Sequence, residues 1–316
     1  MNPLKNKLFL RIIGIIIFSL ILFKLDISKT IDILNQINLK YFIMGLLLFI
    51  PHLLIKIYRW EKILNFQGIR IKFKKLISPY VGATGLGIVT PWKVGELTKV
   101  SYLRNKNVSL GTASFSVFLD RLLDVCFFFI VGTVGMFFLF SFFKEYLFAI
   151  SIFLLTIIGT IIFIIYKRHD ITKIFLRLLI PTKLKEKMYH TLKELWYEFK
   201  KMKGLFIIES LLITALSWLF FYFEVYLFAL ALNIQLTLWQ AIILVSVTSI
   251  VNLLPITISG IGTRDATFIF LFTIFGFSSE QAVALSLLIL FMWIINALFC
   301  MIFWWRKPIK LLNHSS

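Results

Sequence analysis

Two segments of the sequence place cations and carboxylates directly after a break in an apolar stretch, and the first break lies at Thr90-Pro91. Threonine is a good N-cap and proline is favoured at the first helical position, so a helix is predicted to start here. Lys93, Glu96 and Lys99 follow at three-residue steps, so they share one helix face. Glu96 can then hold the two lysines in place without neutralising both. Because free N–H groups and the positive end of a helix dipole attract anions, this pattern predicts an anion-binding site.

The second break follows Asn252, which can bond freed carbonyls or a ligand. Thr263 is predicted to cap a helix whose first turn contains Arg264 and Asp265. We expect the two helix starts to converge, with Lys93 and Arg264, on one bound anionic group. The alternative is that these polar groups only pair with one another and so satisfy the broken backbone.

Further ionisable residues lie inside apolar stretches at three places in the sequence. In Asp120-Arg121-Leu-Leu-Asp124, Arg121 and Asp124 share a helix face, which indicates either a functional site or a structural ion pair. Arg59 precedes a tryptophan, so it is either an interfacial anchor or a ligand of a lipid head group. Glu224 lies between aromatic residues and is a candidate for proton coupling.

These groups must be positioned by membrane-spanning helices. Of the 316 residues, 59% are hydrophobic and 17% are aromatic, and the mean hydropathy is +0.91, which indicates an all-α polytopic membrane protein. The net charge of +19 does not indicate a nucleic-acid partner, because no stretch forms a soluble basic domain. Two cysteines and four scattered histidines predict no metal site, and we find no motif for a cofactor.

The topology follows from apolar length and basic loops. Because a transmembrane helix needs about 20 apolar residues, six stretches qualify as spans: 8–25, 41–57, 109–143, 146–166, 205–232 and 281–304. Most Lys and Arg residues lie in the loops 56–75, 93–106 and 167–203 and at the two termini. By the positive-inside rule, both termini are predicted to be cytoplasmic, in a multi-pass protein of the inner cell membrane.

This assignment predicts that the broken segments, 76–100 and 238–277, are re-entrant hairpins that enter from opposite sides. The whole chain, 1–316, is then one membrane domain made of two halves, 1–143 and 144–316, in an inverted-topology repeat. The insertion 167–203 shows apolar residues at helical spacing against a basic face, which predicts amphipathic helices on the cytoplasmic surface. It is either a linker attracted to anionic lipid or a docking platform for a protein partner.

Together these motifs resemble the lysylphosphatidylglycerol synthase transmembrane-region family, whose members are often called flippase-like membrane proteins. The resemblance covers about residues 8–304, and it rests on Arg59-Trp60, Pro91, Gly95-Glu96, Lys99, Asp120-Arg121, Asp124, Pro255, Gly260, Gly262 and Asp265. The family usually has Arg where this chain has Lys99, and often Asn near Gly85 and Gly87. No aminoacyl-transferase domain follows in the 316 residues, so the resemblance implies lipid handling and not complete lysyl-lipid synthesis.

We therefore expect a lipid translocase or lipid-binding transporter of the cytoplasmic membrane. Its substrate would be an anionic phospholipid or a polyprenyl-phosphate-linked lipid of envelope biogenesis. Lys93, Lys99, Arg121 and Arg264 would hold the phosphate-bearing head group.

Two alternatives stay open. One is a membrane transferase acting on lipid-linked substrates, with Glu96, Asp124 or Asp265 as the base, although no donor-binding motif is visible. The other is an accessory subunit of a complex that modifies envelope lipid or glycan, docked through 167–203.

Overall fold

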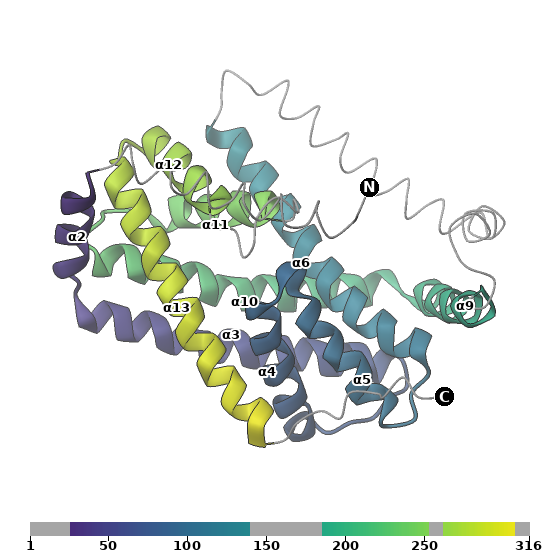
Figure 1. The fold of residues 1–316 in the computed structure, drawn as a ribbon. Helices are drawn as coiled ribbons and strands as arrows, with labels where there is room; N and C mark the ends of the chain where they lie inside the picture. Colours follow the sequence, from purple (N-terminus) through teal and green to yellow (C-terminus); the bar gives the residue numbers. More distant parts are fainter. Residues whose placement is uncertain (1–25, 140–184, 253–261, 307–316) are drawn as a thin grey trace, which may run out of the picture.

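The structure is a computed structural model, and it describes residues 26–139, 185–252 and 262–306. Every regular element in these ranges is a helix (Figure 1). In chain order they are α2 (Ile27–Asn35), α3 (Leu39–Phe66), α4 (Phe73–Val89), the 3-10 helix η1 (Pro91–Leu97), α5 (Thr98–Arg104), α6 (Leu110–Leu139), α9 (Lys185–Lys201), α10 (Gly204–Ala231), α11 (Leu238–Val251), α12 (Thr263–Phe275) and α13 (Ser279–Arg306).

Three of the described helices are long and apolar enough to cross a membrane, namely α3, α10 and residues Ser279–Phe303 of α13. They contain the whole of the predicted span 41–57 and all but the last residue of the predicted spans 205–232 and 281–304. The fourth stretch, 109–143, lies mostly within the 30-residue helix α6. The remaining two stretches, 8–25 and 146–166, lie outside the described residues, so the count of six spans stays a prediction.

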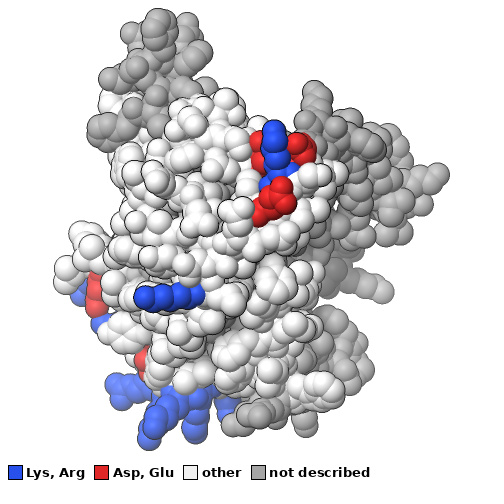
Figure 2. Space-filling view, turned by 90° about the vertical axis from the view of Figure 1, so that its left-hand side faces the viewer, with Lys and Arg blue, Asp and Glu red and all other residues white. Residues whose placement is uncertain are grey.

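The outer surface fits a lipid environment. Large apolar side chains are exposed along the long helices, for example Leu47 on α3, Leu212 on α10 and Leu298 on α13. Figure 2 shows a face on which basic side chains gather at the bottom and a mixed cluster of charges lies in the upper part, while the surface between them is mostly uncharged apart from one basic side chain at mid-height and a few charged groups at the left edge. This is the distribution expected of a chain whose middle faces hydrocarbon and whose ends face water.

The core of the fold is the long contact between α3 and α10, which run side by side (Figure 1). The two helices are antiparallel, because the ring of Phe42 lies 5.5 Å from Phe228 at one end, whereas Arg59 bonds Thr214 near the other. The contact residues of each helix recur every three or four positions, as expected of helices that pack along one stripe. Helix α13 crosses this pair, and α4 and α6 pack at the end where Arg59 lies.

The first broken segment forms a tight helical hairpin. Helix α4 ends at Val89, and η1 and α5 pack back against it. Gly95 makes the close approach possible, since a Cβ there would lie 2.3 Å from the backbone carbonyl carbon of Leu86. The break at Thr90 and the helix start after it are confirmed, whereas entry of this hairpin into the membrane stays a prediction.

As predicted, Thr90 is the N-cap residue at this break and Pro91 is the first residue of the helix. The residues after Thr90 form a 3-10 helix, and no side-chain cap bonds its first N–H groups. Instead the Thr90 hydroxyl donates to the carbonyl of Leu86 (2.7 Å) and accepts from the N–H of Gly95 (2.8 Å). The hydroxyl thus joins the two arms of the hairpin. The tight fold brings the Leu86 carbonyl and the Gly95 N–H closer to this hydroxyl than the N–H groups of the first helical turn.

The second break begins after Val251 and ends at Thr263, with residues 253–261 outside the described part of the chain. The predicted cap is displaced by one residue: Gly262 is the N-cap and Thr263 is the first helical residue. Gly262 has φ = 87°, a conformation that glycine adopts at little cost, so the chain turns there. The carboxylate of Asp265 accepts the N–H of Gly262 at 2.8 Å and thereby supplies the cap from within the helix.

Within the insertion between the two halves, α9 is an amphipathic helix that packs on α6. Phe199 contacts Phe115 edge-on at a centroid distance of 4.9 Å. Glu194 accepts hydrogen bonds from the Ser109 hydroxyl (2.6 Å) and from the Gly111 N–H (2.9 Å), so it caps the start of α6. The helix is confirmed over 185–201, whereas its place on the cytoplasmic surface stays a prediction.

Candidate functional site

Seven ionisable side chains meet where α3, α6 and the η1–α5 arm of the first hairpin come together. All belong to one connected set of salt bridges, and six of the seven are buried. The members of this charge network are Lys56 and Arg59 on α3, Glu96 on η1, Lys99 on α5, and Asp120, Arg121 and Asp124 on α6.

Arg59 lies at the centre of the network and is fully buried. Its Nε and Nη2 donate to Asp120 Oδ1 at 3.0 and 2.7 Å, and Nη2 also donates to the Asp120 carbonyl at 2.8 Å. Its Nη1 donates to Asp124 Oδ1 (2.8 Å) and to Thr214 Oγ1 (2.7 Å). All five guanidinium N–H groups therefore have an acceptor. In this arrangement Arg59 is buried and pairs with protein groups. Its roles as an interfacial anchor or as a ligand of a lipid head group stay predictions.

Asp124 joins α3, α6 and α10. Besides Arg59 it accepts from Lys56 Nζ at 2.8 Å and from the indole N–H of Trp218 at 2.9 Å. The Lys56 ammonium also lies 4.5 Å from the centre of the Trp218 ring, within the range of a cation–π contact. The predicted pairing of Asp124 with Arg121 is confirmed, at 3.7 Å.

Lys99 joins the first hairpin to α6. Its ammonium group lies 2.9 Å from Asp120 Oδ2 and 3.2 Å from Glu96 Oε2. It also lies 4.3 Å from the centre of the Tyr80 ring, and the Tyr80 hydroxyl donates to Asp120 Oδ2 at 3.0 Å. Glu96 forms a second salt bridge with Arg121. The predicted shared face of Glu96 and Lys99 is therefore confirmed.

Lys93 does not pair with Glu96 as the three-residue spacing suggested. It has φ = 56°, which turns its side chain off the common face, and that side chain is exposed. In the described part of the chain it makes no salt bridge, and it lies within electrostatic range of Arg121 and Lys56. Lys93 is thus a free cation at the edge of the network.

The charge network carries a net positive charge. It contains four cations and three carboxylates, so one cation is not neutralised within the set. Arg121 is the least buried member, with 28% of its side chain exposed. Because a buried charge is costly unless it is paired, the excess is best placed at this partly open edge, next to Lys93.

The sequence analysis missed Lys56 and the uncharged partners Tyr80, Thr214 and Trp218. A signal for Lys56 was present, because it lies three residues before Arg59 and so shares its helix face. Asp120 and Asp124 show the matching spacing of four residues. Two cations on one helix stripe and two carboxylates on another are the pattern of facing helices that pair. The uncharged partners carry no comparable signal.

Arg264, in the second half, is buried in a separate polar cluster. Its Nε donates to Ser286 Oγ at 2.7 Å, and its guanidinium lies 5.2 Å from the centre of the Trp293 ring. Asp265 is within salt-bridge distance at 3.5 Å and also pairs with Ser286. Arg264 Nη1 and Asn252 Oδ1 have no hydrogen-bond partner among the described residues.

No contact joins Lys93 and Arg264 in the described part of the chain. Lys93 is exposed on η1, whereas Arg264 is only 2% exposed and lies against α13. The tip of the second hairpin, 253–261, lies outside the described residues. Convergence of the two helix starts on one ligand therefore stays a prediction.

Glu224 lies on α10 within the same contact that holds the network together. It is fully buried, and neither carboxylate oxygen has a hydrogen-bond partner among the described residues. The other candidate carboxylates, those of Glu96, Asp124 and Asp265, all have partners. Within the described ranges no His, Cys, Asp and Glu side chains group as metal ligands.

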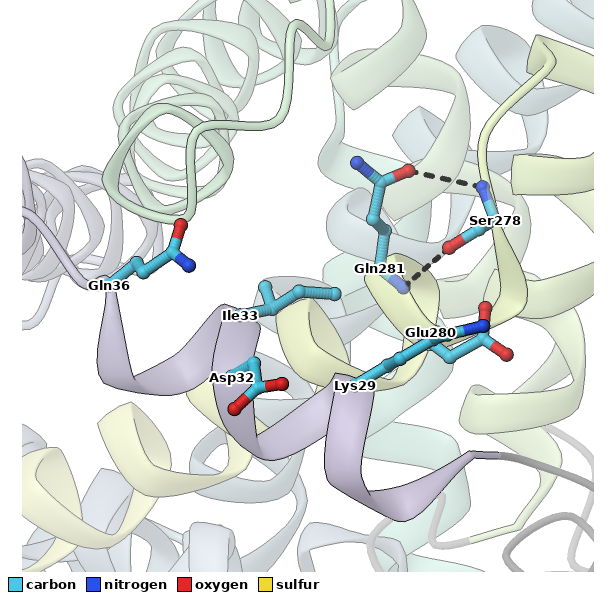
Figure 3. A pocket seen from close by; sticks show the side chains of 7 residues that line it. All are labelled: Lys29, Asp32, Ile33, Gln36, Ser278, Glu280 and Gln281. Carbon is cyan, nitrogen blue, oxygen red and sulfur yellow. Dashed lines mark hydrogen bonds between the residues drawn. The ribbon is translucent and has the colours of Figure 1, made fainter.

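A shallow depression of about 480 Å³ lies elsewhere, between α2 and the start of α13 (Figure 3). The start of α13 is held there by a reciprocal cap in which Ser278 and Gln281 each donate a backbone N–H to the other's side chain, at 3.1 and 3.2 Å. None of the candidate site residues lines this depression; its lining is Lys29, Asp32, Ile33, Gln36, Ser278, Glu280 and Gln281.

Comparison with known proteins agrees with the resemblance found in the sequence. The family profile described as the lysylphosphatidylglycerol synthase TM region matches residues 11–302. The UPF0104 membrane protein MJ1595 of Methanocaldococcus jannaschii is 24% identical over 295 residues, which cover 88% of this chain and 88% of that protein. The UPF0104 membrane protein PH1989 of Pyrococcus horikoshii is 23% identical over 316 residues, covering 90% of this chain and 91% of that protein. Because the family profile spans nearly the whole sequence, the chain is a membrane protein that belongs to the lysylphosphatidylglycerol synthase transmembrane-region family.

Proposed function

We propose that this protein is a lipid translocase of the cell membrane, and that it binds the phosphate of an anionic lipid at the edge of the charge network formed by Lys93 and Arg121. The observation that carries the proposal is the excess of one cation in the buried network, next to a further exposed cation. An anion at this edge neutralises the one positive charge that the three carboxylates do not balance. Arginine and lysine are the side chains that proteins use for phosphate.

The surroundings of the edge fit a lipid better than a soluble anion. Two apolar side chains close to Lys93 in the sequence are exposed, Val89 at the end of α4 and Val94 on η1. A head group held here would leave its acyl or prenyl chains against apolar surface, in the bilayer. The membrane placement of the family supports the same substrate class.

The network also favours transport over catalysis. The two network carboxylates named as candidate bases are already engaged: Glu96 with Lys99 and Arg121, and Asp124 with three donors. A carboxylate held by cations is a weak base, because the cations stabilise its charged form. The transferase alternative therefore has no free base in the network.

The proposal is tested by reconstituting the purified protein into phosphatidylcholine vesicles that contain NBD-labelled phosphatidylglycerol. Dithionite quenching measures movement of the labelled lipid, and native mass spectrometry counts bound phosphatidylglycerol. We expect Lys93→Gln and Arg121→Gln each to weaken lipid retention about tenfold, since a hydrogen bond to a charged group contributes about 1.5–3 kcal/mol. Arg121→Lys keeps the charge and should retain most of the binding.

Lys40→Gln is the matched control, because Lys40 is an exposed lysine on α3 outside the network. Melting temperatures of all variants separate loss of binding from loss of fold. Unchanged retention and movement in the Lys93→Gln, Arg121→Gln double variant would remove this edge from the mechanism. Wild-type protein that binds the lipid without moving it would favour the accessory-subunit alternative.

A further inference from the structure

Glu224 is a buried carboxyl group that the charge network does not use. Buried polar groups in proteins are almost always hydrogen-bonded, and an ionised carboxylate is very costly to bury alone. Glu224 is fully buried, and neither of its oxygens has a partner in the described ranges. The carboxyl group is therefore in its neutral, protonated form in this packed state.

The position of Glu224 on α10 places it in the contact with α3. Thr214 bonds Arg59, Ser217 bonds His52, Phe221 packs 5.7 Å from the His52 ring, and Phe228 packs against Phe42. These α10 residues are spaced by three, four and seven positions. Glu224 lies three residues after Phe221 and four before Phe228, so it divides the spacing of seven into the same helical steps. It thus lies on the α10 stripe that faces α3.

Few titratable or charged groups lie on the helices that surround Glu224. On α3, His52 lies nearest along the contact, followed by Lys56 and Arg59, which are both paired with Asp124 of α6. Helix α11 carries no titratable residue, and the charged residues of α13 lie at its ends. Among the described residues, the surroundings of Glu224 contain no fixed counter-ion, so a proton is the charge partner that this site accommodates.

We propose that Glu224 is a proton-binding site whose occupancy controls the packing of α3 against α10 and, through it, lipid movement; the second part rests on the proposed function. With the proton bound, the two helices pack as observed. When the carboxyl group gives its proton to water, the carboxylate must be hydrated, so the contact has to open. Opening moves α3, which carries Lys56 and Arg59, relative to α6 and so loosens the network that meets the head group.

The experiment measures proton binding and lipid movement separately. Infrared difference spectroscopy of the reconstituted protein reports the C=O stretching band of a protonated carboxyl group, which should be present in the wild type and absent in Glu224→Gln. Movement of NBD-labelled phosphatidylglycerol is then followed with and without a proton gradient. We expect the gradient to change the wild-type rate by up to about tenfold per pH unit, the limit for one bound proton, and to leave Glu224→Gln unaffected.

Glu209→Gln is the control, because Glu209 lies on the same helix in an exposed salt bridge with Lys62; it should keep both the band and the gradient response. A spectrum without the band in wild-type protein overturns the proton site. If the band is present but wild type and Glu224→Gln respond to the gradient alike, the coupling is overturned. If wild type shows the band but moves no lipid, the proposed function fails while the proton site stands.

Discussion

At the scale of single residues, the charge network shows that side-chain identity alone does not define a role. Arg59 and Lys93 are both cations near a predicted site. Arg59 is saturated by acceptors and holds α3 to α6, whereas Lys93 makes no salt bridge in the described part of the chain. The first is suited to structure and the second to a ligand.

The structural part of the network predicts a large loss of stability when one carboxylate is neutralised. Asp120 accepts from Arg59, Lys99 and Tyr80. We expect Asp120→Asn to lower the free energy of unfolding by about 3–5 kcal/mol, because it leaves buried cations without a partner. Thermal or denaturant unfolding in detergent measures this difference.

The matching control is Glu209→Gln, which removes the exposed partner of Lys62. Surface ion pairs contribute about 0–1 kcal/mol, so this variant should unfold almost like the wild type. Equal effects of the two substitutions would show that the network does not hold the helices together.

At the scale of elements, the first hairpin positions two of the seven network members and one of their uncharged partners. Helix α4 supplies Tyr80, while the returning η1–α5 arm supplies Glu96 and Lys99. The arm reaches α6 only because η1 packs closely on α4 at Gly95. The geometry of the break therefore determines where the charges lie.

Gly95→Ala should disturb the site without removing any charged group. The new methyl group would lie 2.3 Å from a backbone atom of Leu86, so the arm must move away from α4. Overpacking costs about 1–3 kcal/mol, and here the shift also pulls Glu96 and Lys99 from their partners. We expect a lower melting temperature and reduced retention of phosphatidylglycerol.

Gly204→Ala is the control for this substitution, because a Cβ at Gly204 would meet nothing within 4 Å. It should leave both the melting temperature and the lipid retention close to wild type. A Gly95→Ala protein with normal retention would show that the position of the arm does not matter for binding.

At the scale of the whole molecule, apolar length and chain-breaking residues predicted much of the fold. The stretches that became α3, α10 and α13 were identified because span length is set by bilayer thickness. Proline and glycine marked both breaks. The partners of Arg59 could not be predicted, because Asp120 lies 61 residues away and helix rotation decides which residues meet. The cap at Thr263 was misplaced by one residue, and Thr90 is the N-cap residue but does not bond the first helical N–H groups, because tertiary packing determined the local turns.

The inverted repeat is the prediction that belongs to this scale. If both termini are cytoplasmic, the loop after α5 faces the cytoplasm and the loop between α10 and α11 faces outward, because α10 crosses the membrane between them. Lys106 and Gln235 are exposed positions in these two loops.

Single cysteines at these sites, in a background without Cys126 and Cys300, should therefore label from opposite sides of the membrane. A membrane-impermeant maleimide applied to intact cells should react with the cysteine at 235 and should reach the one at 106 only after permeabilisation. A cysteine at 106 that is accessible only from outside would contradict the inverted repeat, because the first hairpin would then cross the membrane completely. Labelling of both positions from the same side would contradict the three crossings predicted between them.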